Sequence, residues 1–376
     1  MHPETPTCYP DPVFSSRLDW SLETNTLSAL LKTKSHILDL TESNPTRASF
    51  EYPSQEILSA LTDARSLVYQ PDPRGLLSAR EAVAEYYGNV PASRILLTAS
   101  TSEAYSYLFK LLCDPGDEIL SPRPSYPLFE FLAGLESVRI VQYPLRYDGV
   151  WHIDFDCLSR AITPRTRAIV VVNPNNPTGS FLKPDEWEKL QQFGLPILSD
   201  EVFSDYAFSP VARLSSPSVL VFSMSGLSKI AALPQMKLGW IVASGPGHEA
   251  ALDRLELIAD TYLSVATPVQ FALPRLLQAS SGVRAQIMTR TRANLALLKS
   301  ATRPLHVEGG WYAVLQVPRT RTEEEWALTL LDRQNVLVQP GFYFDFESEA
   351  FLVLSLLTKP EVFAEGIERL IAEIPL

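Results

Sequence analysis

Among the lysines of the chain, Lys229 has surroundings that could make its amine reactive. It lies in the segment Ser223-Met-Ser-Gly-Leu-Ser-Lys-Ile-Ala-Ala-Leu-Pro234, whose other residues are small or apolar. An apolar environment disfavours the charged form of lysine and lowers its pKa, so that the amine can attack a carbonyl group. The alternative for this residue alone is a surface lysine whose stem lies along apolar surface. Carbonyl chemistry at Lys229 is the functional interpretation of the segment.

Two further polar segments follow predicted strands. Asn173-Pro-Asn-Asn-Pro-Thr-Gly179 comes directly after the apolar run that ends at Val172, and Asp200 follows the next run. The two prolines that bracket Asn176 would hold its amide in a fixed place, although such residues are also typical of ordinary turns. Asp200 taken alone is more simply a solvated loop carboxylate. Because α/β sheets bind ligands at the carboxyl ends of their strands, both segments are candidate binding loops.

A fourth segment, Thr98-Ala-Ser-Thr-Ser-Glu103, is rich in hydroxyl groups and opens a predicted helix. Ser100, Thr101 and Ser102 offer hydroxyls, and the first N–H groups of a helix are free to bind an anion. The simpler interpretation is a capping box at the start of the helix. As a site, the segment would cradle an anionic group.

Alternating helix and strand patterns provide the framework for these segments. Short, nearly continuous apolar runs are typical of strands buried on both faces, and they predict a three-layer α/β fold with a mostly parallel sheet between helices. Such runs lie at 168–172, 195–199, 219–223 and 238–242, with further strands at 94–99 and 117–121 and helices at 79–87 and 103–112. After about residue 245 the pattern changes to long helices at 249–263 and 268–300. We therefore expect a large domain, 45–270, and a smaller α+β domain made of 1–44 and 271–376.

Composition excludes several classes of partner. Asp and Glu total 43 against 32 for Lys and Arg, a formal net charge of −11, and no stretch concentrates the bases, so binding to nucleic acid or to an anionic membrane is disfavoured. The longest apolar runs are too short to span a bilayer, and the first residues show no signal-peptide pattern, so we expect a cytoplasmic protein. The histidines are scattered, and Cys8, Cys113 and Cys157 are widely spaced. We expect no metal site and no disulfide framework.

Taken together, the order and spacing of these segments resemble the fold-type I pyridoxal-phosphate enzymes of the class I/II aminotransferase family. The resemblance runs from about Leu38 to near the C-terminus and includes Tyr69-Gln-Pro-Asp-Pro-Arg-Gly75, Asp114-Pro-Gly-Asp117, Pro124-Ser-Tyr126-Pro, Gly309-Gly-Trp-Tyr312 and Val336-Leu-Val-Gln-Pro-Gly341. It implies a pyridoxal 5′-phosphate-dependent aminotransferase with the fold of that family. Its partners would be an amino donor, an amino acid or amine, and a 2-oxo acid acceptor.

The resemblance also implies roles for the four residues nearest the reaction. Lys229 would form the Schiff base with the cofactor aldehyde and later carry a proton between the substrate Cα and cofactor C4′. Asp200 would pair with the pyridine nitrogen and keep it protonated. Asn176 would donate to the phenolic oxygen, and Tyr126 would stack on the ring.

The cofactor phosphate would lie at the start of the helix that follows the hydroxyl-rich segment. By the resemblance it is held by N–H groups and hydroxyls of Ser100, Thr101 and Ser102, with contacts added by Ser228 and Lys237. Tyr69 matches a family tyrosine that reaches the phosphate of the other subunit. A homodimer with composite sites is therefore expected.

Two departures from the family pattern concern the cofactor. Lys237 stands where the family usually has a phosphate-binding arginine, which keeps the charge but loses the bidentate geometry of a guanidinium. Phe203 stands where many members have a tyrosine that bonds the phenolic oxygen. Cofactor affinity and electronic tuning are both expected to differ from the family pattern.

The largest departure concerns the substrate. Val353, in Phe351-Leu-Val-Leu-Ser-Leu356, aligns with the arginine that clamps the substrate α-carboxylate. A charge-assisted contact contributes roughly 1.5–3 kcal/mol, so its loss would weaken binding of an ordinary α-amino acid about ten- to a hundredfold. Ser43 similarly replaces a glycine beside the substrate. Arg47 and Arg74 are possible substitutes for the clamp, although an exposed structural arginine is the simpler interpretation of each.

Two other functions remain open at this point. The same scaffold hosts lyases, racemases and decarboxylases, because the pocket decides which bond at the substrate Cα is broken. A cofactor-binding protein without turnover is the third possibility, and retention of every proton-transfer group argues against it. An aminotransferase of unusual substrate range is the leading prediction.

Overall fold

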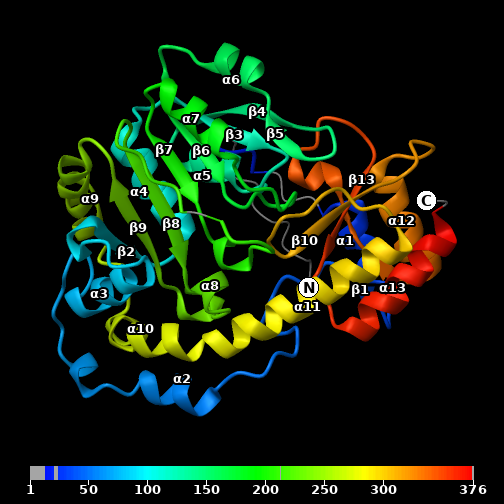
Figure 1. The fold of residues 1–376 in the computed structure, drawn as a ribbon, viewed down its shortest axis with the longest axis horizontal. Helices are drawn as coiled ribbons and strands as arrows, with labels where there is room; N and C mark the ends of the chain where they lie inside the picture. Colours follow the sequence, from blue (N-terminus) through cyan, green and yellow to red (C-terminus); the bar gives the residue numbers. More distant parts are fainter. Residues whose placement is uncertain (1–12, 21–23, 212, 375–376) are drawn as a thin grey trace, which may run out of the picture.

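The computed structural model describes residues 13–20, 24–211 and 213–374, and these build one large sheet, two small sheets and the helices around them (Figure 1). The strands are β1 (Leu38–Asp39), β2 (Ile95–Thr98), β3 (Glu118–Arg123), β4 (Arg139–Tyr147), β5 (Trp151–Ile153), β6 (Thr166–Val172), β7 (Ile197–Asp200), β8 (Val221–Gly226), β9 (Gly239–Ser244), β10 (Tyr312–Gln316), β11 (Val336–Leu337), β12 (Gln339–Pro340) and β13 (Phe351–Ser355). The longer helices are α3 (Leu77–Tyr86), α4 (Thr101–Leu112), α7 (Pro184–Gln192), α9 (His248–Tyr262), α10 (Thr267–Ala279), α11 (Ser281–Ala301), α12 (Glu323–Gln334) and α13 (Pro360–Glu373). The shorter ones are α1 (Thr26–Leu31), α2 (Ser54–Ala60), α5 (Phe129–Leu135), α6 (Phe155–Ala161) and α8 (Leu227–Ile230).

The large sheet has eight strands in the order β2-β9-β8-β7-β6-β3-β4-β5. Neighbours from β8 to β4 pair in parallel, whereas β9 pairs antiparallel with both β2 and β8, and β5 pairs antiparallel with β4. The carboxyl ends of the parallel strands therefore lie at one edge, where the loops after β6, β7 and β8 meet. This confirms the predicted mostly parallel sheet.

Helices cover both faces of this sheet, as the continuous apolar runs predicted. Along β6, Val170 and Val172 pack into a core that includes α4 and α9, while Ile169 and Val171 pack into a second core with α6 and α7. All four side chains are buried. Alternate residues of one strand thus fill two different cores, which explains why the strand has no polar face.

The small sheets are made by the two ends of the described chain. β1 pairs in parallel with β11, and β13 pairs antiparallel with β10 and β12. Helices α1, α12 and α13 pack on these strands around a core that contains Leu40, Trp326 and Phe363. Figure 1 shows these elements together at one end of the molecule, opposite the helices α9 and α3.

The predicted single helix at 268–300 is wrong in one respect, because the structure has two helices, α10 and α11, that meet at Ser280. The hydroxyl of Ser280 donates to the carbonyl of Leu277 at 2.8 Å. A serine that bonds back to its own helix in this way competes with the helical ladder and favours a bend. The pair still forms the long arm that runs along the molecule in Figure 1, with α10 beside α2 and α3, and α11 beside α13.

Polar contacts join the large sheet to the loop before β13. Arg123 and Arg146, at the ends of β3 and β4, both form ion pairs with Glu347. Gln142 donates to Asp345 at 2.9 Å. At the loop before β13, mainly charged groups therefore hold the three-stranded sheet against the carboxyl edge of the large sheet.

None of the helices in the described ranges is both long enough and apolar enough to cross a membrane.

Candidate active site

A cavity of about 900 Å³ lies at the carboxyl edge of the large sheet. It brings together nine of the predicted site residues: Ser100, Thr101, Ser102, Tyr126, Asn176, Asp200, Phe203, Ser228 and Lys229. Its remaining wall is formed by Ser43, Tyr105, Leu132, Val172, Val202, Gly226, Leu238 and Tyr312.

Lys229 lies on the short helix α8, directly after β8, and its backbone is firmly held. The hydroxyl of Tyr206 donates to the Lys229 carbonyl at 2.7 Å. The Nζ atom lies 5.0 Å from the ring centre of Trp311 and 5.5 Å from that of Phe203. Burial lowers the pKa of Lys229 to about 8, although the nearby charge of Asp200 opposes the shift. The amine is therefore much more available as a nucleophile than an exposed lysine.

Asp200 is the last residue of β7, and its carboxylate is buried. The Val202 backbone N–H donates to Oδ1, and the Tyr105 hydroxyl donates to Oδ2 at 3.1 Å. Burial raises the pKa of Asp200 to about 6, while these two hydrogen bonds and the charge of Lys229 oppose the rise. A solvated loop carboxylate, the simpler interpretation of the sequence, does not describe this residue. The carboxylate keeps acceptor capacity for a cationic group.

The start of α4 lines the cavity with Ser100, Thr101 and Ser102. Ser100 is the N-cap, and its Oγ accepts from the Glu103 N–H at 3.1 Å, while Glu103 accepts from the Ala99 N–H at 2.6 Å. β9 passes very close to this end, because a Cβ on Gly239 would lie 3.1 Å from the Ser100 carbonyl carbon and 3.2 Å from the Thr101 nitrogen. Ser100 therefore caps the helix and also lines the cavity, while the glutamate bonds back to Ala99 and not to Ser100 as in a capping box.

The loop after β6 holds Asn176 through its neighbours. Asn175 donates to the Pro124 carbonyl at 3.2 Å and accepts from the Thr178 hydroxyl at 2.8 Å. Asn176 itself is buried, and its side-chain oxygen has no partner among the described residues. A buried acceptor without a partner is costly, so a ligand that donates a hydrogen bond to this oxygen would stabilise the arrangement.

Tyr126 projects from the segment after β3 into the same cavity. It is 38% exposed and packs edge-on against Phe129 of α5. Burial, followed by the charge of Asp200, raises its pKa. The ring is thus a largely neutral, partly covered aromatic surface at the mouth of the site, suitable for stacking on a flat ligand.

Ser43, in the loop after β1, and Tyr312, at the start of β10, form the opposite wall. Burial raises the pKa of Tyr312 to about 12, although its hydrogen bond with Ser43 lowers the pKa and so opposes the shift. Behind this wall Val353 is fully buried in a core that also contains Phe203, Trp311 and Tyr312. Among the described residues that line the cavity, Asp200 and Lys229 are the only ones with charged side chains.

Four residues considered from the sequence lie elsewhere. Lys237 follows Met236 with an exposed side chain and is not among the lining residues. Tyr69 is 79% exposed, beside a separate hollow. Arg74 is paired with Asp253 and Glu256, and Arg47 is exposed, so neither lines the cavity.

Sequence reasoning missed Tyr105, which both lines the cavity and bonds to Asp200. A signal was present: Tyr105 is four residues after Thr101, and residues with this spacing lie on the same face of a helix. The helix start and the tyrosine were thus placed together by α4, but nothing in the sequence indicated Asp200 as the partner.

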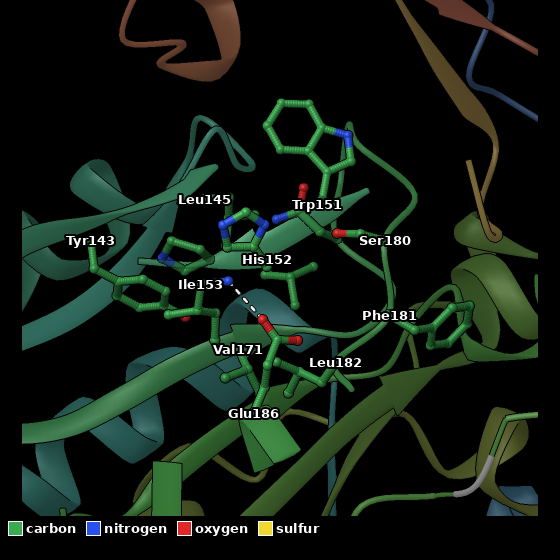
Figure 2. Close-up of a pocket in the computed structure, with 13 residues that line it drawn as sticks. Tyr143, Leu145, Trp151, His152, Ile153, Val171, Ser180, Phe181, Leu182 and Glu186 are labelled. Atoms are coloured by element: carbon green, nitrogen blue, oxygen red, sulfur yellow. Dashed lines mark hydrogen bonds between the residues drawn. The ribbon is translucent and has the colours of Figure 1, made fainter. Parts of the chain in front are cut away.

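A smaller cavity of about 330 Å³ is lined by residues of β4, β5 and the segment before α7 (Figure 2). Figure 2 shows Glu186 below β5, where its Oε1 accepts from the Ile153 N–H at 2.7 Å. The other oxygen accepts from the Lys183 N–H at 2.9 Å and so begins α7. This carboxylate is fully used in joining β5 to α7, and the cavity contains none of the predicted site residues.

Comparison with known proteins agrees with this geometry. The family model described as aminotransferase class I and II matches residues 35–370. The chain is 26% identical to the glutamate-pyruvate aminotransferase AlaA of Haemophilus influenzae over 365 residues, which cover 89% of each chain. It is 30% identical to the tyrosine aminotransferase of Bos taurus over 338 residues, which cover 82% of this chain and 74% of the bovine one. Among solved structures, the alanine aminotransferase from Pyrococcus furiosus superposes with a TM-score of 0.81 at 25% identity, over 91% of this chain and 93% of that one.

The residues of the cavity fit the cofactor of that family. A buried amine, a buried carboxylate, the hydroxyl-rich start of a helix and an asparagine amide line one cavity. The chain belongs to the class I and II aminotransferases, and it is a pyridoxal 5′-phosphate-dependent aminotransferase of fold type I.

Proposed function

We propose that this aminotransferase recognises its substrates without the arginine that usually holds their α-carboxylate. The observation that carries the proposal is Val353, which is fully buried in an aromatic core behind the cavity wall. No arginine lines the cavity in the described part of the chain. The missing arginine should therefore hardly change the affinity for amino donors that lack an α-carboxylate. Ordinary α-amino acids should bind more weakly, because their carboxylate has no ion pair.

The roles of the cofactor-binding residues are part of this proposal. Bound pyridoxal 5′-phosphate supplies the electron sink that stabilises negative charge on the substrate Cα. Asp200 would hold the pyridine nitrogen, and Asn176 would donate to the phenolic oxygen. Tyr126 covers one face of the ring. Phe203, which has no hydroxyl, contributes only apolar contact from the end of β7.

The phosphate is held at the start of α4. Ser100, Thr101, Ser102 and Ser228 all line this part of the cavity. The positive end of the helix dipole and the first N–H groups favour an anion there. Lys237 lies outside the lining residues, so any contribution it makes acts at longer range or after a side-chain movement.

Proton transfer is assigned to Lys229. Its Nζ would bind the cofactor aldehyde and, when free, would accept and return the proton of the substrate Cα. The pKa of about 8 suits this role, because a base is most effective when its pKa is near the working pH. The apolar rings of Trp311 and Phe203 beside Nζ keep water away from the amine.

The substrate wall is expected to use hydroxyl groups in place of charge. Ser43, after β1, and Tyr312, on β10, line the cavity and offer neutral donors and acceptors. Neutral hydrogen bonds are about half as strong as charge-assisted ones, so a 2-oxo acid acceptor is also expected to bind weakly. An amine, or an amino acid whose carboxylate lies far from the reacting amine, fits this wall as donor.

The test is a panel of amino donors, with and without an α-carboxylate, mixed with the purified holoenzyme. The expected result is conversion of bound cofactor to its pyridoxamine form, faster with amines than with the matched α-amino acids. Faster reaction with the amino acids would contradict the missing-clamp proposal. Breakdown of substrate without that conversion would indicate a lyase, racemase or decarboxylase, and no spectral change with any donor would indicate a binding protein without turnover.

We also propose that the protein acts as a cytoplasmic homodimer. Tyr69 supports composite sites, since it is 79% exposed and free to approach a second subunit. Cys113 and Cys157 are free thiols, which suits a reducing compartment; Cys8 lies outside the described residues. Sedimentation at several concentrations tests the dimer, and Tyr69→Phe should weaken cofactor binding only in the dimeric form.

The domain division at 45–270, with 1–44 and 271–376 as the smaller unit, is likewise proposed. Separate cores under the large and small sheets support it. Limited proteolysis that releases a resistant fragment of about residues 45–270 would agree with the division, and resistant fragments that cross both boundaries would contradict it.

A further inference from the structure

We propose that Tyr105 is a positioning residue for the cofactor: its hydroxyl, donated to Asp200, holds that carboxylate ionised and oriented toward a protonated pyridine nitrogen. The hydroxyl donates to Asp200 Oδ2 at 3.1 Å. Both residues line the cavity, and neither is more than 7% exposed. Tyr105 acts through Asp200 and is assigned no chemical step of its own.

The position of Tyr105 on α4 makes the contact stiff. The first turn of this helix, from Thr101, forms the phosphate cradle, and Tyr105 is one turn further along the same face. Its ring packs edge-on against Phe129 at 5.2 Å and lies 5.9 Å from Phe109. One helix therefore carries both the phosphate cradle and the support for the carboxylate at the other end of the cofactor.

The need for this support follows from the burial of Asp200. A carboxylate removed from water favours its neutral form unless hydrogen bonds or nearby positive charge stabilise the anion. Oδ1 has the Val202 N–H, and Oδ2 has only the Tyr105 hydroxyl among the described protein groups. Without Tyr105, the carboxylate would lose one of its two donors and the constraint on its rotation.

The charged and titratable groups around Asp200 come from several elements. Lys229 on α8 stabilises the anion, and Glu201, the next residue, has a buried carboxylate whose charge opposes it. Tyr126 and Tyr143 both interact electrostatically with Tyr105, and Tyr126 also interacts with Asp200. Burial raises the pKa of Tyr105 well above its usual range, so its hydroxyl stays protonated and remains a donor.

A matched control is available in Tyr143. It is also buried, and its hydroxyl donates to a backbone carbonyl, that of Val170, at 2.8 Å. Tyr105→Phe and Tyr143→Phe therefore remove the same atom from similarly buried rings. Only the first removes a partner of Asp200, so any difference between the variants reports on the carboxylate and not on the loss of a buried hydroxyl.

The experiment measures binding of two probes to the apoprotein. Pyridoxine 5′-phosphate has the ring nitrogen but no aldehyde, so its affinity does not depend on a covalent bond to Lys229. Its 1-deaza analogue lacks the ring nitrogen. We expect Tyr105→Phe to weaken pyridoxine 5′-phosphate about tenfold at pH 7, which is the loss of one hydrogen bond to a charged group, and the deaza analogue less than twofold. Tyr143→Phe should change neither.

Equal weakening of both probes by Tyr105→Phe would overturn the proposal, because it would show a general distortion of the site. Unchanged binding of both would overturn it as well. A pH series adds a second measurement: the pH at which pyridoxine 5′-phosphate binding is half lost should lie higher in Tyr105→Phe than in the native protein. If the phenylalanine variant does not fold, Tyr105→His, which keeps a ring and an N–H donor, should bind at least as tightly as any variant without a donor.

Discussion

Replacing Val353 with arginine tests the missing clamp directly. Val353 packs with Phe203 and Tyr312, both of which line the cavity, so a longer side chain at this position has a path to the substrate wall. A guanidinium that reaches an α-carboxylate should contribute about 1.5–3 kcal/mol, equivalent to roughly a ten- to hundredfold gain in affinity. The gain should appear only with donors that carry the carboxylate.

The same change has a cost in the absence of ligand. Val353 is fully buried, so a larger side chain overpacks the core by about 1–3 kcal/mol, and a guanidinium without a partner adds a desolvation penalty. Val353→Arg is therefore expected to unfold at a lower temperature than the native protein. A carboxylate ligand should restore part of the difference, since binding to the folded state alone stabilises it. Val353→Met, long but uncharged, is the control for overpacking.

The assay compares L-alanine with isopropylamine, in which a methyl group replaces the carboxylate. The ratio of their rates of cofactor conversion, measured at low donor concentration, cancels changes common to both donors. Val353→Arg should raise the ratio at least tenfold in favour of alanine, and Val353→Met should leave it unchanged. A folded Val353→Arg protein with an unchanged ratio would refute the reasoning, because it would mean that position 353 does not face the carboxylate.

Three further outcomes are expected. Lys229→Ala should bind cofactor that borohydride no longer fixes to the protein, as mass spectrometry would show; a fixed adduct would contradict the assignment. The pKa of Asp200 is raised to about 6 in the folded state. Between about pH 4 and pH 6 the folded protein therefore binds a proton more tightly than the unfolded chain. The stability of the apoprotein falls as the pH rises through this range. Asp200→Asn should therefore raise the free energy of unfolding of the apoprotein by up to about 3 kcal/mol above pH 6 and not below pH 4, as measured by urea unfolding; a gain that did not vary with pH would be a different effect. Gly239→Ala should weaken cofactor binding about tenfold by pushing against the start of α4, whereas Gly282→Ala, with open space around its Cβ, should stabilise α11 slightly and leave cofactor binding unchanged.

The sequence predicted the sheet well because its strands are buried on both faces. The run at 168–172 has no polar face, and β6 indeed packs Val170 and Ile169 into different cores. The predicted single helix at 268–300 is wrong at Ser280, where the serine hydroxyl donates to a carbonyl of the preceding turn. Periodicity continues through such a bend, so the pattern of apolar residues does not reveal it.

The candidate site was predictable to a similar degree. Lys229, Asp200 and Asn176 each follow a strand, and the parallel topology brings the ends of those strands together. The contact between Tyr105 and Asp200 and the aromatic core around Val353 were not predictable, because the partners are distant in sequence and are placed by the packing of α4 and of the β10–β13 sheet. Residue type and spacing thus identify groups at strand ends better than groups that support them.

The ion pairs that tie the loop before β13 to the large sheet make the substrate wall sensitive to salt. Arg123 and Arg146 share Glu347, and all three side chains are partly exposed, so dissolved ions screen their attraction. The aromatic contact between Phe203 and Trp311 on the other side of the wall has no such dependence. Ionic strength should therefore change how closely Tyr312 and Ser43 approach the cofactor-bearing sheet. Raising sodium chloride from about 50 mM to about 0.5 M should increase the KM for an amine donor, and Glu347→Gln should remove most of that dependence.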